Sequence, residues 1–151
     1  MKIFKIFALA AMMFGMVACD NGKTPEPVID PGVTTAYTGT TSVVFMGSTT
    51  DTPNVEVTVD PDATTKTMEI VFKKVQFVPA MPALDITVPS VPYTESDGSI
   101  SISGNNIIPI CMGGEFPMYT VTNLTGTITS TTISMMLNFG AIPTTYKGTK
   151  K

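Results

Sequence analysis

Apolar and polar residues alternate along most of this chain, starting near residue 36. Residues 55–59 show the pattern most simply, because three valines at every second position are separated by Glu56 and Thr58. Successive side chains of a β-strand point to opposite faces of the sheet, so a period of two is typical of strands with one buried face. The alternation predicts eight strands, over residues 37–45, 55–59, 68–77, 86–93, 100–102, 119–128, 133–139 and 145–148.

Short turn-forming segments separate the predicted strands. Residues 47–54, 60–62 and 96–98 are rich in Gly, Pro, Asp, Asn or Ser, which favour tight turns between antiparallel neighbours. Pro79 and Pro82 exclude a central strand between the third and fourth segments. This arrangement predicts an all-β fold, a single antiparallel up-and-down β-barrel, because closure removes exposed sheet edges. An open β-sandwich is the alternative architecture.

The phase of the alternation changes within three of the predicted strands. Even-numbered positions are apolar before Lys73-Lys74, whereas Val75 and Phe77 are the apolar positions after it. The phase also changes at Pro89 and near Asn123. One inserted residue shifts the phase of a strand in this way, so we expect a β-bulge at Lys73-Lys74.

Residues 104–117 form the longest stretch without alternation. The stretch contains four isoleucine or cysteine side chains and Phe116, which is too apolar for a freely solvated loop. We therefore expect it to fold back over one end of the domain as a lid or plug. Cys111 lies between two apolar residues and is interpreted as a small buried hydrophobic residue.

The N-terminus has the organisation of an export signal. Lys2 and Lys5 precede a short apolar run that ends at Met16-Val17-Ala18-Cys19, and the run is too short to be a permanent membrane span. These four residues resemble the lipobox of bacterial lipoproteins, which implies cleavage before Cys19 and lipid attachment to its thiol. An ordinary cleavable leader with a chance cysteine is the alternative.

Three regions follow from this interpretation. Residues 1–18 are the lipoprotein signal peptide, residues 19–35 are the lipidated cysteine and a flexible tether rich in Pro, Gly and Thr, and residues 36–151 are the barrel domain. The expected location is the cell envelope, lipid-anchored in the outer membrane on its periplasmic or surface face. Two acyl chains or more give stable anchoring.

Composition narrows the chemistry of the domain. Loss of residues 1–18 leaves seven lysines against twelve acidic residues, a net charge of −5, and the chain has no arginine. A nucleic-acid partner is excluded, because binding would need a basic face. The chain also has no histidine, which removes the usual general base and zinc ligand. We expect a protein that is not an enzyme, with no metal site and no cofactor.

Large apolar side chains on the inward positions and in the lid are the candidate ligand-binding residues. An eight-stranded barrel can be filled by its own side chains or can hold one small ligand, so core filling is the alternative role for all of them. The candidates in the barrel interior are Phe45, Phe72, Met135 and Phe139. The candidates in the lid are Met112 and Phe116, and Tyr119 is the candidate at the start of the strand that follows the lid.

Several short motifs resemble the calycin-like β-barrel domain of Bacteroidales lipoproteins. They are Tyr37-Thr38-Gly39-Thr40, Val75-Gln76-Phe77 leading to Met81-Pro82, Asp85-Ile86-Thr87-Val88 and Tyr146-Lys147-Gly148. The resemblance covers residues 35–151 and implies a small lipocalin-like barrel without catalytic residues. Tyr37 and Tyr146 each precede a glycine by two residues, and we expect each ring to pack over its glycine. Lining of a ligand cavity is the alternative role for these two rings.

Two functions from different classes fit these observations. In the first, a lipid-anchored, lipocalin-like barrel binds a small apolar or amphipathic ligand. In the second, the domain is a structural or adhesive accessory module of an envelope assembly and contacts an envelope protein through its outer face. Both functions place the protein at the membrane through the Cys19 lipid.

Overall fold

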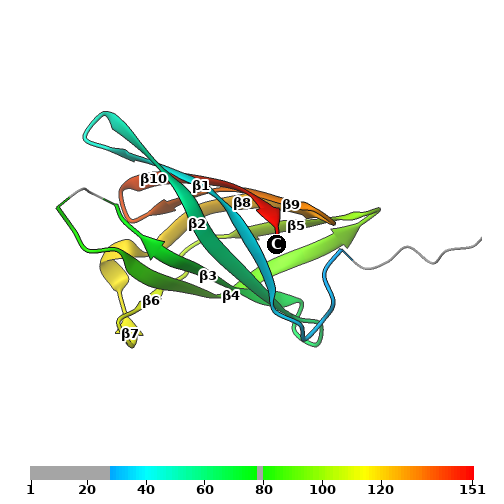
Figure 1. Ribbon diagram of the computed structural model, residues 1–151. Helices are drawn as coiled ribbons and strands as arrows, with labels where there is room; N and C mark the ends of the chain where they lie inside the picture. Colours follow the sequence, from blue (N-terminus) through cyan, green and yellow to red (C-terminus); the bar gives the residue numbers. More distant parts are fainter. Residues whose placement is uncertain (1–27, 78–79) are drawn as a thin grey trace, which may run out of the picture.

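Eight long strands form a closed antiparallel barrel in the computed structural model, which describes residues 28–77 and 80–151 (Figure 1). Each long strand pairs with its neighbours along the chain, and β1 pairs with β10 to close the wall. The predicted all-β, up-and-down barrel is therefore confirmed. The strands are β1 (Thr35–Phe45), β2 (Ser48–Asp62), β3 (Thr67–Val75), β4 (Leu84–Ser96), β5 (Ser99–Gly104), β8 (Val121–Thr129), β9 (Thr132–Phe139) and β10 (Ile142–Lys150).

The connection between β5 and β8 contains three short elements. They are β6 (Ile110–Cys111), β7 (Gly114–Glu115) and the 3-10 turn η1 (Pro117–Tyr119). β6 and β7 form a small hairpin, and β6 pairs with the first half of β4. The irregular segment predicted at residues 104–117 therefore returns to the barrel and extends its wall.

The two ends of the barrel are built from different connections. At the base end lie the turns at residues 63–66, 97–98 and 130–131, and the chain enters the barrel there from residue 28. At the loop end lie the turns at residues 46–47 and 140–141, together with the long connection containing β6, β7 and η1 (Figure 1).

The β1–β2 hairpin is longer than the sequence predicts. Residues 47–54 were expected to form a turn, but β2 begins at Ser48 and pairs with β1 back to Phe45. The turn is confined to Met46 and Gly47, and the two strands project beyond the barrel as a ribbon (Figure 1). The turn-like residues Pro53 and Asn54 instead form a bulge, where Asn54 has a positive φ of 59°.

Residues with a left-handed backbone conformation lie at the other bulges. The register of β3 against β4 shifts beside Lys74 (φ 55°) and Ser90 (φ 53°), and that of β8 against β9 shifts beside Asn123 (φ 52°). The bulge predicted at Lys73-Lys74 is confirmed, and the phase changes at Pro89 and Asn123 have the same physical cause. The backbone N–H of Lys74 donates to Asp85 Oδ1 over 2.8 Å. This hydrogen bond gives a partner to the N–H group at the bulge.

Two glycines allow β1 and β10 to approach each other closely. Gly39 and Gly148 are direct cross-strand partners, and a Cβ on Gly39 would collide with the carbonyl oxygen of Lys147. The Tyr146 hydroxyl lies 2.6 Å from the position of a Cβ on Gly148, so the predicted packing of this ring over its glycine is confirmed. The atoms nearest to Gly39 belong to β10 and not to Tyr37.

The predicted tether is partly incorporated into the barrel domain. Ile29 is only 3% exposed and belongs to the hydrophobic core, and Val28 packs against that core. The Gly32 N–H donates to the Pro61 carbonyl over 3.0 Å, which holds the segment at the base end. A flexible tether over residues 28–35 is therefore wrong, because this segment buries an apolar side chain. The signal peptide of residues 1–18, Cys19 and the remaining tether up to residue 27 lie outside the described residues.

Within the part of the chain that the structure describes, we find no helix with the length and hydrophobicity of a transmembrane segment.

Candidate functional site

Six aromatic rings form a continuous series from the middle of the barrel to its loop end. Successive ring centroids are 5.0–6.1 Å apart, a separation at which edge-to-face and stacked pairs are favourable. We call this the aromatic series. In order, its members are Tyr146, Phe72, Phe139, Phe77, Tyr119 and Phe116.

The inner part of the aromatic series is fully buried. Phe72 on β3 contacts Phe139 on β9 and Tyr146 on β10, and the exposed fraction of each ring rounds to zero. The ring on β3 thus meets the rings of the neighbouring strands β9 and β10 in the barrel interior. The middle of the barrel is accordingly a packed apolar core.

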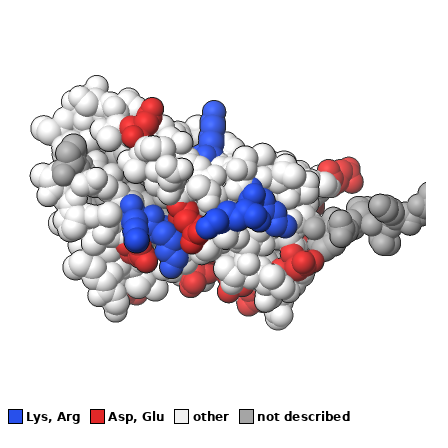
Figure 2. All heavy atoms as spheres, viewed as in Figure 1, with Lys and Arg blue, Asp and Glu red and all other residues white. Residues whose placement is uncertain are grey.

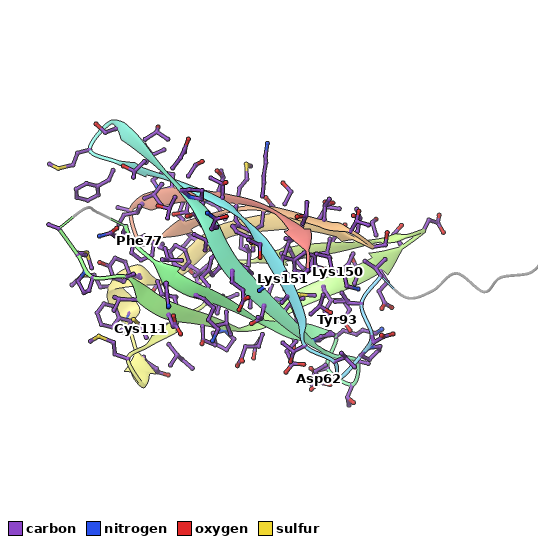
Figure 3. All side chains as sticks on the ribbon, in the orientation of Figure 1. Asp62, Phe77, Tyr93, Cys111, Lys150 and Lys151 are labelled. Carbon is purple, nitrogen blue, oxygen red and sulfur yellow. The ribbon has the colours of Figure 1, made fainter. Side chains whose placement is uncertain are left out.

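The outer part of the series reaches the solvent at the loop end. Phe116 directly precedes η1 and Tyr119 is its last residue; the two rings stack with an interplanar angle of 13°, and both are half-buried. Phe77, labelled in Figure 3, connects them to Phe139. Two partly exposed aromatic rings therefore lie at the loop end, connected through Phe77 to the buried core.

Backbone contacts hold η1 and its rings in place. The Gly140 N–H donates to the Thr120 carbonyl over 3.0 Å, and the Thr120 N–H donates to Pro117 over 3.1 Å. Gly140 has a φ of 62°, and a Cβ there would lie 2.5 Å from the Met118 carbonyl oxygen. The β9–β10 turn therefore fits against η1 only because residue 140 is a glycine.

The residues predicted to contact a ligand separate into three groups. Phe72, Met135 and Phe139 lie in the barrel interior as expected, each at most 1% exposed. Phe116 and Tyr119 lie together at the loop end. Phe45 and Met112 do not join either group.

The interior position predicted for Phe45 is wrong. Phe45 is 40% exposed although it shares the alternation of Val43, which is 1% exposed. The β1–β2 ribbon extends past the barrel at this point, so the inward face of β1 has no interior left to face.

The lid position predicted for Met112 is also wrong. Met112 occupies the turn between β6 and β7 and is 78% exposed. Its neighbour Cys111 points inward and is 4% exposed, which confirms the prediction of a small buried hydrophobic residue. Figure 3 labels Cys111 near the β6–β7 hairpin.

Sequence reasoning omitted two members of the aromatic series from the candidates, Phe77 and Tyr146. The phase change at Lys73-Lys74 had already placed Phe77 on the inward side, and this was the signal that could have identified it. Tyr146 was expected to pack over its glycine, with the lining of a ligand cavity as the alternative. Its role as the innermost ring depends on Phe72 from a distant strand, which local alternation does not indicate.

Two interior tyrosines differ in hydrogen bonding. The Tyr146 hydroxyl donates to the Val55 carbonyl over 2.9 Å, whereas the Tyr37 hydroxyl and the Thr41 hydroxyl have no partner among the described residues. Burial raises the pKa of both phenols above the ordinary value. Both therefore stay neutral at physiological pH and act as structural groups.

The ionisable groups near the loop end offer little acid–base chemistry. Burial, together with the nearby negative charge of Asp85, raises the pKa of the Cys111 thiol, so the thiol stays protonated and weakly nucleophilic. Asp85 itself is exposed, caps Lys74 and faces Lys73 Nζ at 3.7 Å. Across the described residues, no group of three or more His, Cys, Asp or Glu side chains is arranged to hold a metal ion.

The fold and the site together define a small up-and-down barrel with an apolar interior that opens as an aromatic surface at one end. The family model described as calycin-like beta-barrel domain matches residues 33–151. The chain therefore belongs to the calycin-like β-barrel family. No curated protein and no solved structure gives a significant match.

Proposed function

We propose that this protein is a lipid-anchored, non-enzymatic protein of the cell envelope that binds a small apolar or amphipathic molecule at the loop end of its barrel. The observation that carries the proposal is the half-buried stack of Phe116 on Tyr119, continuous with the buried rings of the core. A calycin-like barrel fits a ligand-binding module of this kind.

The filled middle of the barrel determines where the ligand would bind. Phe72 and Phe139 occupy the centre, so a ligand deep inside would have to displace packed aromatic rings at a cost of several kcal/mol. At the loop end a ligand needs only to cover rings that are already partly exposed. The Met81 sulfur lies 3.8 Å from the Tyr119 hydroxyl and supplies a flexible apolar side chain beside the stack.

Dodecanoic acid is a suitable probe for this site. We would use the chain from residue 19 with Cys19→Ser, because the barrel wall is complete within residues 35–150 and no detergent is then needed. Phe116→Ser should weaken binding about tenfold or more, since burial of a phenylalanine is worth about 1.5–3 kcal/mol. The measurement is isothermal titration calorimetry.

A matched control is Met136→Ser, because Met136 is 58% exposed on β9 and is not part of the aromatic series. This variant should bind dodecanoic acid as the parent does. Equal affinity of the Phe116→Ser variant and the parent would contradict a site at the loop end.

The anchor is supported by the motif Met16-Val17-Ala18-Cys19 and by the entry of the chain at the base end, away from the aromatic surface. Metabolic labelling with an alkyne-tagged palmitate tests it in a bacterial host that processes lipoproteins. The full chain should be labelled and should fractionate with membranes, and Cys19→Ser should abolish the label. A labelled Cys19→Ser chain would contradict attachment at that thiol.

A further inference from the structure

The barrel wall opens between β2 and β3 toward the loop end. The last pair that joins these two strands is Val57 with Phe72. In the described part of the chain, residues 48–56 of β2 have strand partners only on β1, and residues 73–75 of β3 have strand partners only on β4. Figure 1 shows the β1–β2 ribbon rising away from the end of β3. We call this opening the β2–β3 split.

A bulge in each strand accounts for the split. Asn54 lies at the bulge of β2 against β1, and Lys74 lies at the bulge of β3 against β4. A bulge bends its strand and increases the local twist, so the two strands turn apart after their last pair. A hollow of about 430 Å³ lies where they part, lined by residues 52–56 of β2 and by Lys73 and Lys74 of β3.

The edge of β2 that faces the split carries main-chain hydrogen-bonding groups. Ser48 follows a two-residue turn and pairs with Phe45, which makes them the hydrogen-bonded pair that closes the hairpin. Alternate residues of an antiparallel pair direct their N–H and C=O groups away from the partner strand. The N–H and C=O groups of Thr49 and Asp51 therefore face the split. An open edge of this kind is a template for a further strand.

The open edge is short. Pro53 has no N–H to donate, and the bulge at Asn54 interrupts the edge there. An added strand therefore pairs only along residues 48–52. An edge of this length suits one guest segment and does not support the open-ended strand addition that leads to aggregation.

Most of the charged side chains beside the hollow compensate each other. Lys151 Nζ lies 2.6 Å from Glu56 Oε2, and Lys73 Nζ lies 3.7 Å from Asp85 Oδ2. Figure 2 shows Lys atoms lying next to Asp and Glu atoms across the middle of this face, over β2 and β3. These pairs leave the region close to neutral.

Two charged side chains of the split are left over. Over residues 28–77 and 80–151, neither Lys74 at the hollow nor Asp51 nearer the tip of the ribbon takes part in an ion pair. A guest strand antiparallel to β2 begins beside the hollow and ends beside the tip. Its complementary charges are therefore an acidic residue near its N-terminal end and a basic residue near its C-terminal end.

We propose that the β2–β3 split binds an extended segment of a protein partner, which adds to the edge of β2 as an antiparallel strand with an acidic residue beside Lys74 and a basic residue beside Asp51. The site lies on the wall of the barrel and is separate from the stack of Phe116 on Tyr119. A bilayer surface supplies no strand to pair with the edge. A second copy that paired through the same edge would bring like charges together.

The test uses a short labelled peptide of Thr and Val with one Glu near its N-terminus and one Lys near its C-terminus. Its binding to the chain from residue 19 with Cys19→Ser is measured by fluorescence anisotropy. Exchange of the Glu and the Lys within the peptide should weaken binding about tenfold, because two attractive charge pairs become repulsive.

Two variants at one position test the strand pairing. Thr49→Pro removes an N–H that faces the split and should weaken binding about fivefold or more. Thr49→Ala keeps this N–H and should bind the peptide as the parent does. The Tm of Thr49→Pro should be unchanged, because proline is tolerated on an edge strand where the N–H faces the solvent.

Variants at two lysines test the charge pairing and do not alter the ribbon, so they remain decisive if Thr49→Pro lowers the Tm. Lys74→Gln should weaken peptide binding about threefold. Lys147→Gln changes an exposed lysine on β10 and should leave binding unchanged. Phe116→Ser should also leave it unchanged, which separates this site from the proposed ligand site.

Four outcomes would overturn the proposal. The first is that the peptide does not bind the parent. The second is that neither Thr49→Pro nor Lys74→Gln weakens its binding. The third is binding of the parent to vesicles of phosphatidylethanolamine and phosphatidylglycerol that Lys74→Gln abolishes, which would make the split a membrane contact. The fourth is a dimer in analytical ultracentrifugation that Thr49→Pro abolishes, which would make the partner a second copy.

Discussion

The base end and the loop end of the barrel use their side chains in opposite ways. Charged residues pair with each other at the base end and on the adjoining wall: Lys66 Nζ lies 3.2 Å from Glu95 Oε2 at the base end, and Lys151 Nζ lies 2.6 Å from Glu56 Oε2 on the outer wall. The Asp62 side chain accepts the Thr64 N–H over 2.8 Å, which lowers the pKa of that carboxyl. Figure 3 labels Asp62, Tyr93, Lys150 and Lys151 toward this end.

At the loop end, apolar side chains face the solvent and the turns carry backbone strain. Met46, Met112 and Met118 are each more than three-quarters exposed. At the base end, the Asp97-Gly98 turn has the residues that its conformation favours, with Gly98 at a φ of 79°, whereas Lys66 in the turn at residues 63–66 has a positive φ of 56°. The two ends therefore differ in their exposed side chains, with paired charges toward the base end and exposed apolar side chains at the loop end.

The largest expected difference is between two phenylalanines. Phe72 is fully buried and contacts two other rings, whereas Phe45 is 40% exposed on the ribbon. Phe72→Ala should lower the free energy of unfolding by about 3–5 kcal/mol, and Phe45→Ala by about 0.5 kcal/mol. Urea denaturation measures both values. Similar losses for the two variants would show that the ribbon is packed in solution.

The base end should respond strongly to loss of a buried residue outside the strands. Ile29→Ala removes a side chain that is 3% exposed and should cost about 2 kcal/mol or more. Val33→Ala, four residues further on and 52% exposed, is the matched control and should cost little. Thermal denaturation compares them, and equal Tm values would mean that residues 28–35 do not stabilise the barrel.

The two interior tyrosines should respond differently to loss of the hydroxyl. Tyr146→Phe leaves the Val55 carbonyl without its donor and should cost about 1–2 kcal/mol. Tyr37→Phe removes a buried hydroxyl that has no partner among the described residues, so stability should be unchanged or increased. A loss for Tyr37→Phe as large as that for Tyr146→Phe would indicate that an internal water pairs the Tyr37 hydroxyl.

The smallest effect concerns the pH dependence of an ion pair on the outer wall of the barrel. A hydrogen bond from Lys151, with its positive charge, lowers the pKa of the Glu56 carboxyl. The pair therefore stabilises the fold above the pKa that Glu56 has in the unfolded chain, and this contribution is lost as the pH falls through the lower, folded pKa. Titration of the Glu56 side chain by NMR should show the lowered pKa, and Lys151→Met should return it toward the ordinary value. Because the pair is exposed and screened, the effect on Tm should be small.

The sequence alone determined the strand count, the closed meander and the bulge at Lys73-Lys74. Each depends on local alternation, because a side chain on a strand must face either the core or the solvent, and one extra residue exchanges the two faces. The burial of Cys111 followed from its apolar neighbours. Of the candidate site, Phe72, Met135 and Phe139 were placed correctly for the same reason.

Only the tertiary structure decided where the wall of the barrel ends and what closes it. Phe45 follows the inward alternation and yet is exposed, because the interior ends before the β1–β2 ribbon does. Ile29 lies in a segment without alternation and yet is buried, because the base end offers it an apolar surface. The aromatic series joins residues from β3, β9 and β10, and contacts so distant in sequence leave no local pattern.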